Sequence, residues 1–187
     1  SKIDINHHPV LHTWLIRFFM KLGKNLFGEY EHGLGLLSLL QMLILSYALA
    51  RLAMLLKKKG VGLLVVALTA LFSAIWFMNA CLSVTMIKDT LHAAFLVLFV
   101  CHFAEIVINP LEYCGKKQNL ILLPIVVFLM CALRNNGIHI YLFCFAGLAI
   151  LRIFKIKKVK NFIPLIIVIL LPVILFKIYT GPVFEML

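Results

Sequence analysis

The sequence predicts an all-α fold, a polytopic bundle of about six transmembrane helices preceded by an amphipathic helix in the membrane interface. Hydrophobic residues make up 64% of the 187 residues and charged residues only 13%, whereas a typical soluble domain has roughly 25% charged residues. Apolar runs recur between short polar clusters, at the length that a hydrocarbon layer about 30 Å thick selects. The apolar surface of such a chain is too large for one small core, which excludes a soluble globular domain.

Six apolar runs are bounded by charged or polar residues and are predicted to span the membrane. They are residues 34–56, 61–80, 90–108, 120–133, 138–154 and 162–179. The fourth run is short, and we expect its helix to extend into the flanking Gln118, Asn119 and Arg134. The sequence therefore divides into an external segment, residues 1–33, and a transmembrane domain, residues 34–187.

Residues 10–27 have a different pattern, which is typical of a helix that lies in the interface. Arg17, Lys21 and Lys24 fall at near-helical spacing, and apolar side chains such as Trp14 and Phe18 fill much of the rest. This pattern predicts an amphipathic interfacial helix. A first transmembrane helix is the alternative, because a segment of this length can just span if its basic side chains extend to the headgroups.

Basic residues are confined to connections between the apolar runs, mainly as clusters at 57–59, 116–117 and 155–160. They form no stripe on a soluble face, so the net charge of +11 indicates membrane topology and not nucleic-acid binding. The clusters fall in alternate connections, and positive-inside bias places all of them in the cytoplasm. We predict a multi-pass plasma-membrane protein with both ends external. An external tail before the first span normally needs an upstream helix, so we expect a fragment.

The unusual polar motifs all fall on the external side in this topology. They are Asn6-His7-His8-Pro9, the turn at 85–90 and Arg134-Asn135-Asn136-Gly137. Charged side chains near membrane depth are costly, and they usually pair or line a functional cavity. The motifs therefore predict one anionic ligand site, whose candidate residues are His7, His8, Lys88, Asp89, Arg134, Asn135 and Asn136. Arginine suits a phosphate because its planar fork can donate two hydrogen bonds.

Each of these residues also has a structural interpretation. Asp89 in the first turn of a helix complements the helix dipole, and Lys88 can extend to lipid headgroups. The segment 134–137 is typical of a turn between helices, in which Asn and Gly tolerate left-handed backbone geometry. These interpretations remain open beside the ligand site.

The histidines near the start of the chain could be interpreted as metal ligands. His7, His8 and His12 fall close to one helical face, but the proline that follows His8 explains part of the motif as a helix start. We expect no metal. Three polar residues inside the spans are expected to make hydrogen bonds between helices: Arg51, His102 and Glu105.

The chain has a His8-Pro9 motif, an interfacial helix ending in Leu26-Phe27-Gly28 and a long span from Leu34. A helical hairpin then leads to Lys88-Asp89, and a further span ends in Arg134-Asn135-Asn136-Gly137. This order resembles the GT-C fold of polytopic glycosyltransferases, such as protein O-mannosyltransferases and aminoarabinose transferases. Among bacterial proteins, the run from Asn6 to Thr13 looks most like an uncharacterised family of multi-pass membrane proteins related to that superfamily.

The resemblance implies transfer of a sugar from a polyprenyl-phosphate-linked donor to an external acceptor, without a cofactor. In such enzymes a carboxylate shortly after the first transmembrane helix acts on the acceptor, and basic residues bind the donor phosphate. Asp4 is then the catalytic candidate, and Arg134 falls near the position of a basic residue that follows a span. The chain departs from the family pattern because it has no first transmembrane helix.

A non-catalytic membrane protein is the alternative function, either a lipid-linked glycan transporter or an assembly partner whose external residues bind headgroups. A transporter is expected to have interrupted helices, for which Pro124 and Pro172 are the candidates. A third possibility is the remnant of an enzyme that has lost its first helix and its activity.

Overall fold

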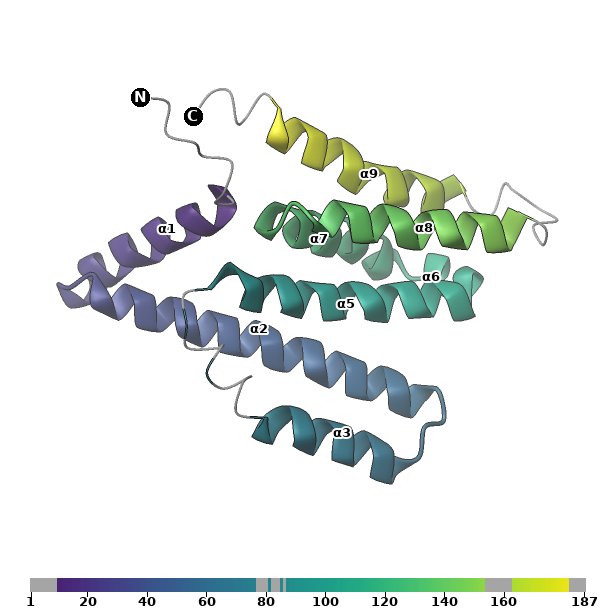
Figure 1. Ribbon diagram of the computed structural model, residues 1–187, viewed down its shortest axis with the longest axis horizontal. Helices are drawn as coiled ribbons and strands as arrows, with labels where there is room; N and C mark the ends of the chain where they lie inside the picture. Colours follow the sequence, from purple (N-terminus) through teal and green to yellow (C-terminus); the bar gives the residue numbers. More distant parts are fainter. Residues whose placement is uncertain (1–9, 77–80, 82–84, 86, 154–162, 182–187) are drawn as a thin grey trace. The chain divides into compact units, whose positions relative to one another are not determined.

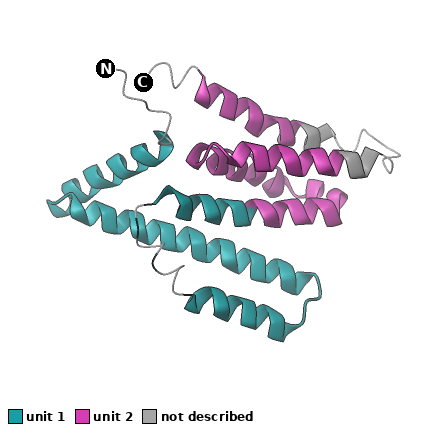
Figure 2. Cartoon of the chain, in the orientation of Figure 1, with its two compact units in different colours: residues 1–98 teal, residues 99–187 magenta. Residues whose placement is uncertain are grey.

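The computed structural model describes residues 10–76, 81, 85, 87–153 and 163–181. Within these ranges the chain forms helices and short turns, with no strand, and the predicted all-α class is confirmed. The chain divides into two compact units, residues 1–98 and residues 99–187 (Figure 2). The boundary falls inside one continuous helix, α5, Lys88–Ile108.

The first unit contains α1, Val10–Phe27, α2, Glu31–Lys58, and α3, Leu63–Ile75, together with the first part of α5 (Figure 1). The bounds of α1 are those predicted for the amphipathic helix, whose basic side chains Arg17, Lys21 and Lys24 are all exposed. The helix α2 begins three residues before the predicted span. The interfacial location of α1 stays a prediction.

The helices α1 and α2 meet at a corner where two glycines allow backbone contact. A Cβ added at Gly23 would lie 2.6 Å from Cα of Gly33, and one added at Gly33 would lie 2.7 Å from Cα of Met20. The chain turns at Gly28, whose φ of 85° lies in the left-handed region that ends many helices. The close approach of the two helices therefore depends on Gly23 and Gly33.

A short turn joins α2 to α3 and carries the first basic cluster, Lys57–Lys59. Gly60 has a φ of 81°, its amide donates to the carbonyl of Lys57 and the amide of Val61 donates to that of Leu56. This is the Schellman arrangement, which satisfies carbonyl groups at a helix end. The lysines lie at the negative end of the α2 dipole, where cations are favoured.

The second unit contains the rest of α5, the short α6, Pro110–Gly115, α7, Lys117–Leu133, α8, Gly137–Ile153, and α9, Ile163–Thr180. Aromatic rings join α5 to α8 in its core. The ring of Tyr141 lies 5.7 Å from that of Phe99 and 4.8 Å from that of Phe145, which is the spacing of favourable aromatic pairs.

The most extensive helix contact of this unit lies between α7 and α9. Pro124 in α7 and Pro172 in α9 are both buried, and both lie inside their helices. The hydroxyl of Tyr141 donates a hydrogen bond of 2.6 Å to the carbonyl of Ile169. Because Pro172 has no amide hydrogen, the carbonyl just before Ile169, four residues before the proline, lacks its usual helical partner. The prolines thus lie within helices that continue past them.

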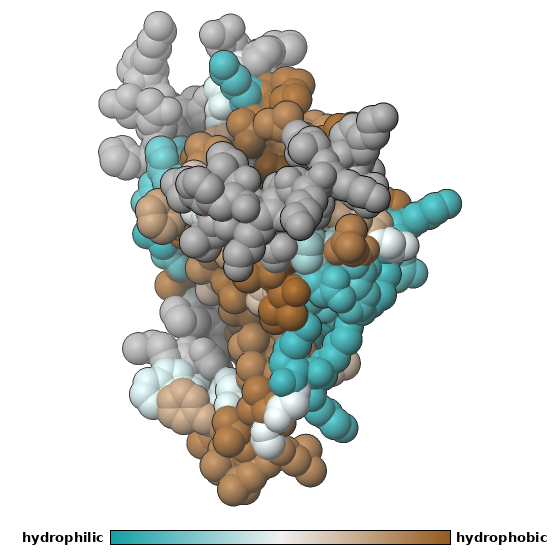
Figure 3. All heavy atoms as spheres, turned by 90° about the vertical axis from the view of Figure 1, so that its right-hand side faces the viewer, coloured by the Kyte–Doolittle hydropathy of each residue, from teal (hydrophilic) through white to brown (hydrophobic). Residues whose placement is uncertain are grey.

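All six predicted runs form helices, but their lengths differ. The helices α2 and α5, of 28 and 21 residues, are long and apolar enough to cross a membrane. The helices α7 and α8 have 17 residues each and rise about 26 Å, slightly less than a hydrocarbon core of about 30 Å. Figure 3 shows hydrophilic residues gathered beside a large area of exposed apolar residues.

Candidate functional site

The predicted site residues fall into three groups in the structure. Asp4, His7 and His8 lie outside the described residues. Lys88 and Asp89 form the first turn of α5 and are half-buried, where Asp89 complements the positive end of the helix dipole. They belong to the first unit and Arg134 to the second, so a shared cavity for the three side chains stays a prediction.

Arg134, Asn135 and Asn136 form the turn between α7 and α8, and all three are exposed. The amide of Gly137 donates to the carbonyl of Arg134 over 2.8 Å. The interpretation of this segment as a turn between helices is confirmed, but the turn does not use left-handed backbone geometry, since the described residues with positive φ are only Gly28 and Gly60. Gly137 instead suits a tight space, because a Cβ there would lie 3.0 Å from the carbonyl oxygen of Met130.

A further cation lies at the same end of the second unit. In Figure 1, α7 and α9 both end, and α8 begins, at the left of the view. The rings of Phe128 in α7 and Tyr179 in α9 lie 5.8 Å apart, which fixes the two helix ends beside each other. The last turn of α9 carries the exposed Lys177, and the first turn of α8 carries the exposed His139.

Sequence reasoning missed Lys177 because it lies inside the predicted span 162–179. The available signal was that it is the single charged residue in the sequence of α9. We refer to Arg134, His139 and Lys177 as the cationic end of the second unit. The two neighbouring asparagines, Asn135 and Asn136, add amide groups that can donate hydrogen bonds to the same ligand.

The cationic end lacks acidic residues in its own helices. The sequence from Lys117 to Phe184 contains no Asp or Glu, so α7, α8 and α9 contain no carboxylate of their own. Arginine and lysine side chains near membrane depth are costly unless an opposite charge, a backbone group or water surrounds them. Exposed cationic and amide groups of this kind can bind an anionic ligand.

At the opposite end of the unit, several polar side chains pair with one another within the chain. Lys116 contacts Glu112 over 2.9 Å, and the amide of Glu112 donates to Oδ1 of Asn109, which caps α6. Pro110 occupies the first position of α6, where its missing amide hydrogen costs nothing. We refer to this region as the α6 corner.

A buried polar pair holds the α6 corner together. The hydroxyl of Tyr113 lies 2.9 Å from Nδ1 of His102 and 3.2 Å from the carbonyl oxygen of Asn119. Tyr113 and His102 are 2% and 4% exposed. The prediction that His102 makes a hydrogen bond between helices is confirmed, and its role is structural because both partners of the phenol are within the protein.

A family match covers nearly the whole chain. The chain matches DUF6020, a family of unknown function, over residues 5–183. The chain belongs to the DUF6020 family. No curated protein and no solved structure matches it.

For this DUF6020 chain, the family match includes both the α6 corner and the cationic end.

Metal binding has little support among the described residues, where no group of three His, Cys, Asp or Glu side chains converges. His12 lies buried on α1, and its predicted neighbours His7 and His8 are outside the described ranges. The cationic end is therefore the candidate that the described residues support best.

Proposed function

We propose that the chain is a multi-pass membrane protein that binds the phosphate of a polyprenyl-phosphate-linked sugar at the cationic end of the second unit. The sugar is then transferred to an external acceptor, as in the GT-C enzymes that the sequence resembles. The exposed polar groups at this end support the proposal. Arg134, Asn135 and Asn136 lie exposed in the turn between α7 and α8, and Lys177 lies exposed in the last turn of α9.

Exposed apolar surface supports the membrane location. The most apolar part of α2 is only 11% buried within the protein, unlike the core helix of a soluble protein. Leu64 in α3 and Phe143 in α8 are 72% and 82% exposed. Shorter helices such as α7 can be accommodated by local thinning of the bilayer or by side chains that extend to its surface. The six-span topology with cytoplasmic lysine clusters is part of this proposal.

The chemistry of the ligand follows from the residues at the cationic end. Arg134 can bind two phosphate oxygens through its fork, and Lys177 adds a compact positive charge. In the transfer step the acceptor oxygen bonds to the anomeric carbon, and the bond from that carbon to the phosphate breaks. The phosphate leaves with the electron pair and gains negative charge, which nearby cations stabilise. Asp4 is the proposed base that takes the proton of the acceptor.

The test compares Arg134→Ala with Arg134→Lys in the complete protein, using a radiolabelled polyprenyl-phosphate sugar. We expect Arg134→Ala to reduce transfer by about 100-fold, because the departing phosphate loses a charge-assisted partner. Arg134→Lys restores part of the rate, since lysine keeps the charge but lacks the fork. Arg17→Ala removes another exposed arginine, in α1, and serves as the matched control.

Thermal unfolding in detergent is measured beside transfer for every variant. Wild-type transfer in Arg134→Ala would remove this residue from the site. Binding of the donor by the wild-type protein without transfer would favour the transporter or assembly partner over the transferase. A fall of unfolding temperature in Arg134→Ala that matches its loss of transfer would assign the arginine to the turn alone.

A further inference from the structure

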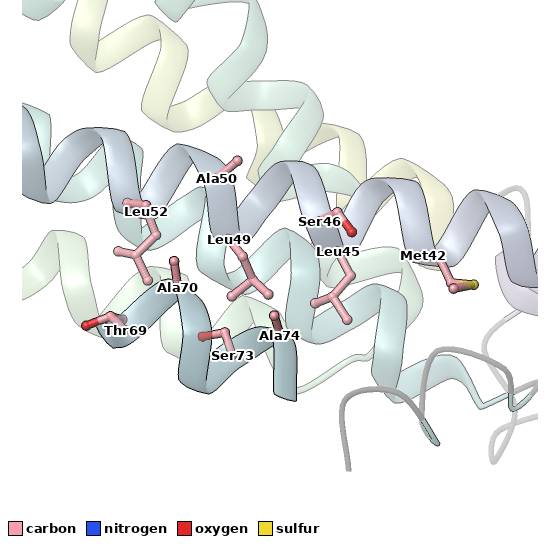
Figure 4. A pocket seen from close by; sticks show the side chains of 11 residues that line it. Met42, Leu45, Ser46, Leu49, Ala50, Leu52, Thr69, Ala70, Ser73 and Ala74 are labelled. Carbon is pink, nitrogen blue, oxygen red and sulfur yellow. The ribbon is translucent and has the colours of Figure 1, made fainter. Parts of the chain in front are cut away.

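A groove with a volume of about 410 Å³ lies between α2 and α3 within the first unit (Figure 4). Leu45, Leu49 and Leu52 extend from α2 toward α3, and Ala70 and Ala74 extend from α3 toward α2. The volume falls within the range of about 300–1,000 Å³ that is usual for small-molecule sites.

The lining of this groove is mostly apolar. It contains no charged residue. The hydroxyl of Thr69 donates a hydrogen bond of 2.8 Å to the carbonyl of Val65 within α3, an arrangement that satisfies a helical threonine without an outside ligand. The mostly apolar lining favours a hydrocarbon chain as the ligand of the groove.

The α2 wall of the groove matches one leaflet of a bilayer in length, whereas the α3 wall is shorter and extends from Thr69 to Ala74. The α2 wall extends from Met42 to Ala53, which is about 16 Å at the helical rise of ~1.5 Å per residue. Half of a hydrocarbon core about 30 Å thick is about 15 Å. An acyl chain of a membrane lipid therefore has the length to occupy the groove from end to end.

A concentrated positive charge adjoins one end of the groove. Lys57 lies one helical turn beyond Ala53 on the same face of α2, and Lys57, Lys58 and Lys59 are all exposed. The sequence from His32 to Lys88 contains no Asp or Glu. Anionic headgroups are attracted to such a cluster beside a membrane helix.

We propose that the groove and the lysine turn together bind one anionic phospholipid, with an acyl chain between α2 and α3 and the phosphate on Lys57–Lys59. The site relies on the membrane location of α2 and α3 in the proposed function but is independent of sugar transfer. An apolar helix of another protein would also cover the groove, but it would not carry the negative charge that the three lysines attract.

The test is native mass spectrometry of the full chain in detergent, titrated with dioleoylphosphatidylglycerol or dioleoylphosphatidylcholine. We expect one bound lipid and a preference of about ten-fold for phosphatidylglycerol, which the combined Lys57→Gln, Lys58→Gln and Lys59→Gln variant abolishes. Ala70→Phe fills the groove and weakens binding of both lipids by about ten-fold. Ala67→Phe changes an exposed alanine of α3 outside the groove and is the matched control.

Wild-type binding by Ala70→Phe, or an unchanged preference in the lysine variant, would overturn the proposal. A second outcome would also overturn the proposal: the wild-type protein is a dimer that binds no phosphatidylglycerol, and Ala70→Phe dissociates this dimer. That result would assign the groove to a second copy of the chain. Because no sugar donor is present, failure here leaves the transfer proposal standing. Circular dichroism confirms that each variant remains helical.

Discussion

Replacement of Gly33 by alanine tests the close approach of α1 and α2. The added Cβ would lie 2.6 Å from the carbonyl carbon of Phe19 and 2.7 Å from Cα of Met20. Carbon atoms are most stable at separations of about 3.5–4.0 Å, so the two helices must move apart by about 1 Å. The contacted atoms both belong to the backbone of α1. Backbone atoms of a helix cannot rotate away from the added Cβ as a side chain would.

The same helix supplies a matched control, since a Cβ at Gly35 meets nothing within 4 Å. Both changes gain the helix propensity of alanine, about 1 kcal/mol over glycine. Only Gly33→Ala adds overpacking, which costs about 1–3 kcal/mol. We therefore expect Gly33→Ala to be less stable than Gly35→Ala by that amount.

Thermal unfolding in detergent, followed by helical circular dichroism, measures this difference. In a protein of this size each kcal/mol lowers the midpoint by about 2–4 °C, so Gly33→Ala should unfold about 2–12 °C below Gly35→Ala. Gly23→Ala should resemble Gly33→Ala, because its Cβ would lie 2.6 Å from Cα of Gly33. Equal midpoints for the Gly33 and Gly35 variants would refute the backbone contact.

Three further predictions concern the rest of the chain. Tyr113→Phe removes a buried hydroxyl with two partners and should lower the free energy of unfolding, measured with a chemical denaturant, by about 1–3 kcal/mol. Tyr30→Phe removes an exposed hydroxyl and should lower it by less than about 0.5 kcal/mol. Burial raises the pKa of the Cys114 thiol above its ordinary value, so its thiolate forms at higher pH. Maleimide labelling of Cys114 should therefore increase at higher pH than labelling of a small-molecule thiol in water. Identical pH profiles for the two thiols would contradict this. In a chain without native cysteines, an impermeant reagent applied to intact cells should label Asn136→Cys and not Lys58→Cys, and the reverse pattern would invert the topology.

The helices could be predicted from sequence because each apolar run has clear polar boundaries. The bounds of α1 were predicted to the residue, since the apolar and basic spacing continues until Gly28 ends the helix. The helix α6 was missed although Asn109 and Pro110 give a recognisable start signal. Its six residues lie between two long apolar runs, and the hydropathy pattern of those runs indicated only a polar connection there.

The pairing of helices could not be predicted in the same way. Runs that are apolar on every side do not indicate which face meets a neighbour, so the contact of Phe128 with Tyr179 has no signal in the sequence. The proposed anionic site was predicted from charges at span ends, a criterion that includes Arg134 but not Lys177. Lys177 lies within the last turn of its helix, and only the ring contact between α7 and α9 shows which other helix ends beside it.

The hydrogen bond from Tyr141 to Ile169 also affects the order in which the protein can be assembled. The two residues are 28 positions apart, so the ribosome completes α8 well before the acceptor carbonyl has been synthesised. Until then the phenol must remain near water or bind a temporary partner, because an unsatisfied hydroxyl in hydrocarbon costs several kcal/mol. With the membrane topology proposed above, insertion of α8 and α9 as a pair avoids this intermediate.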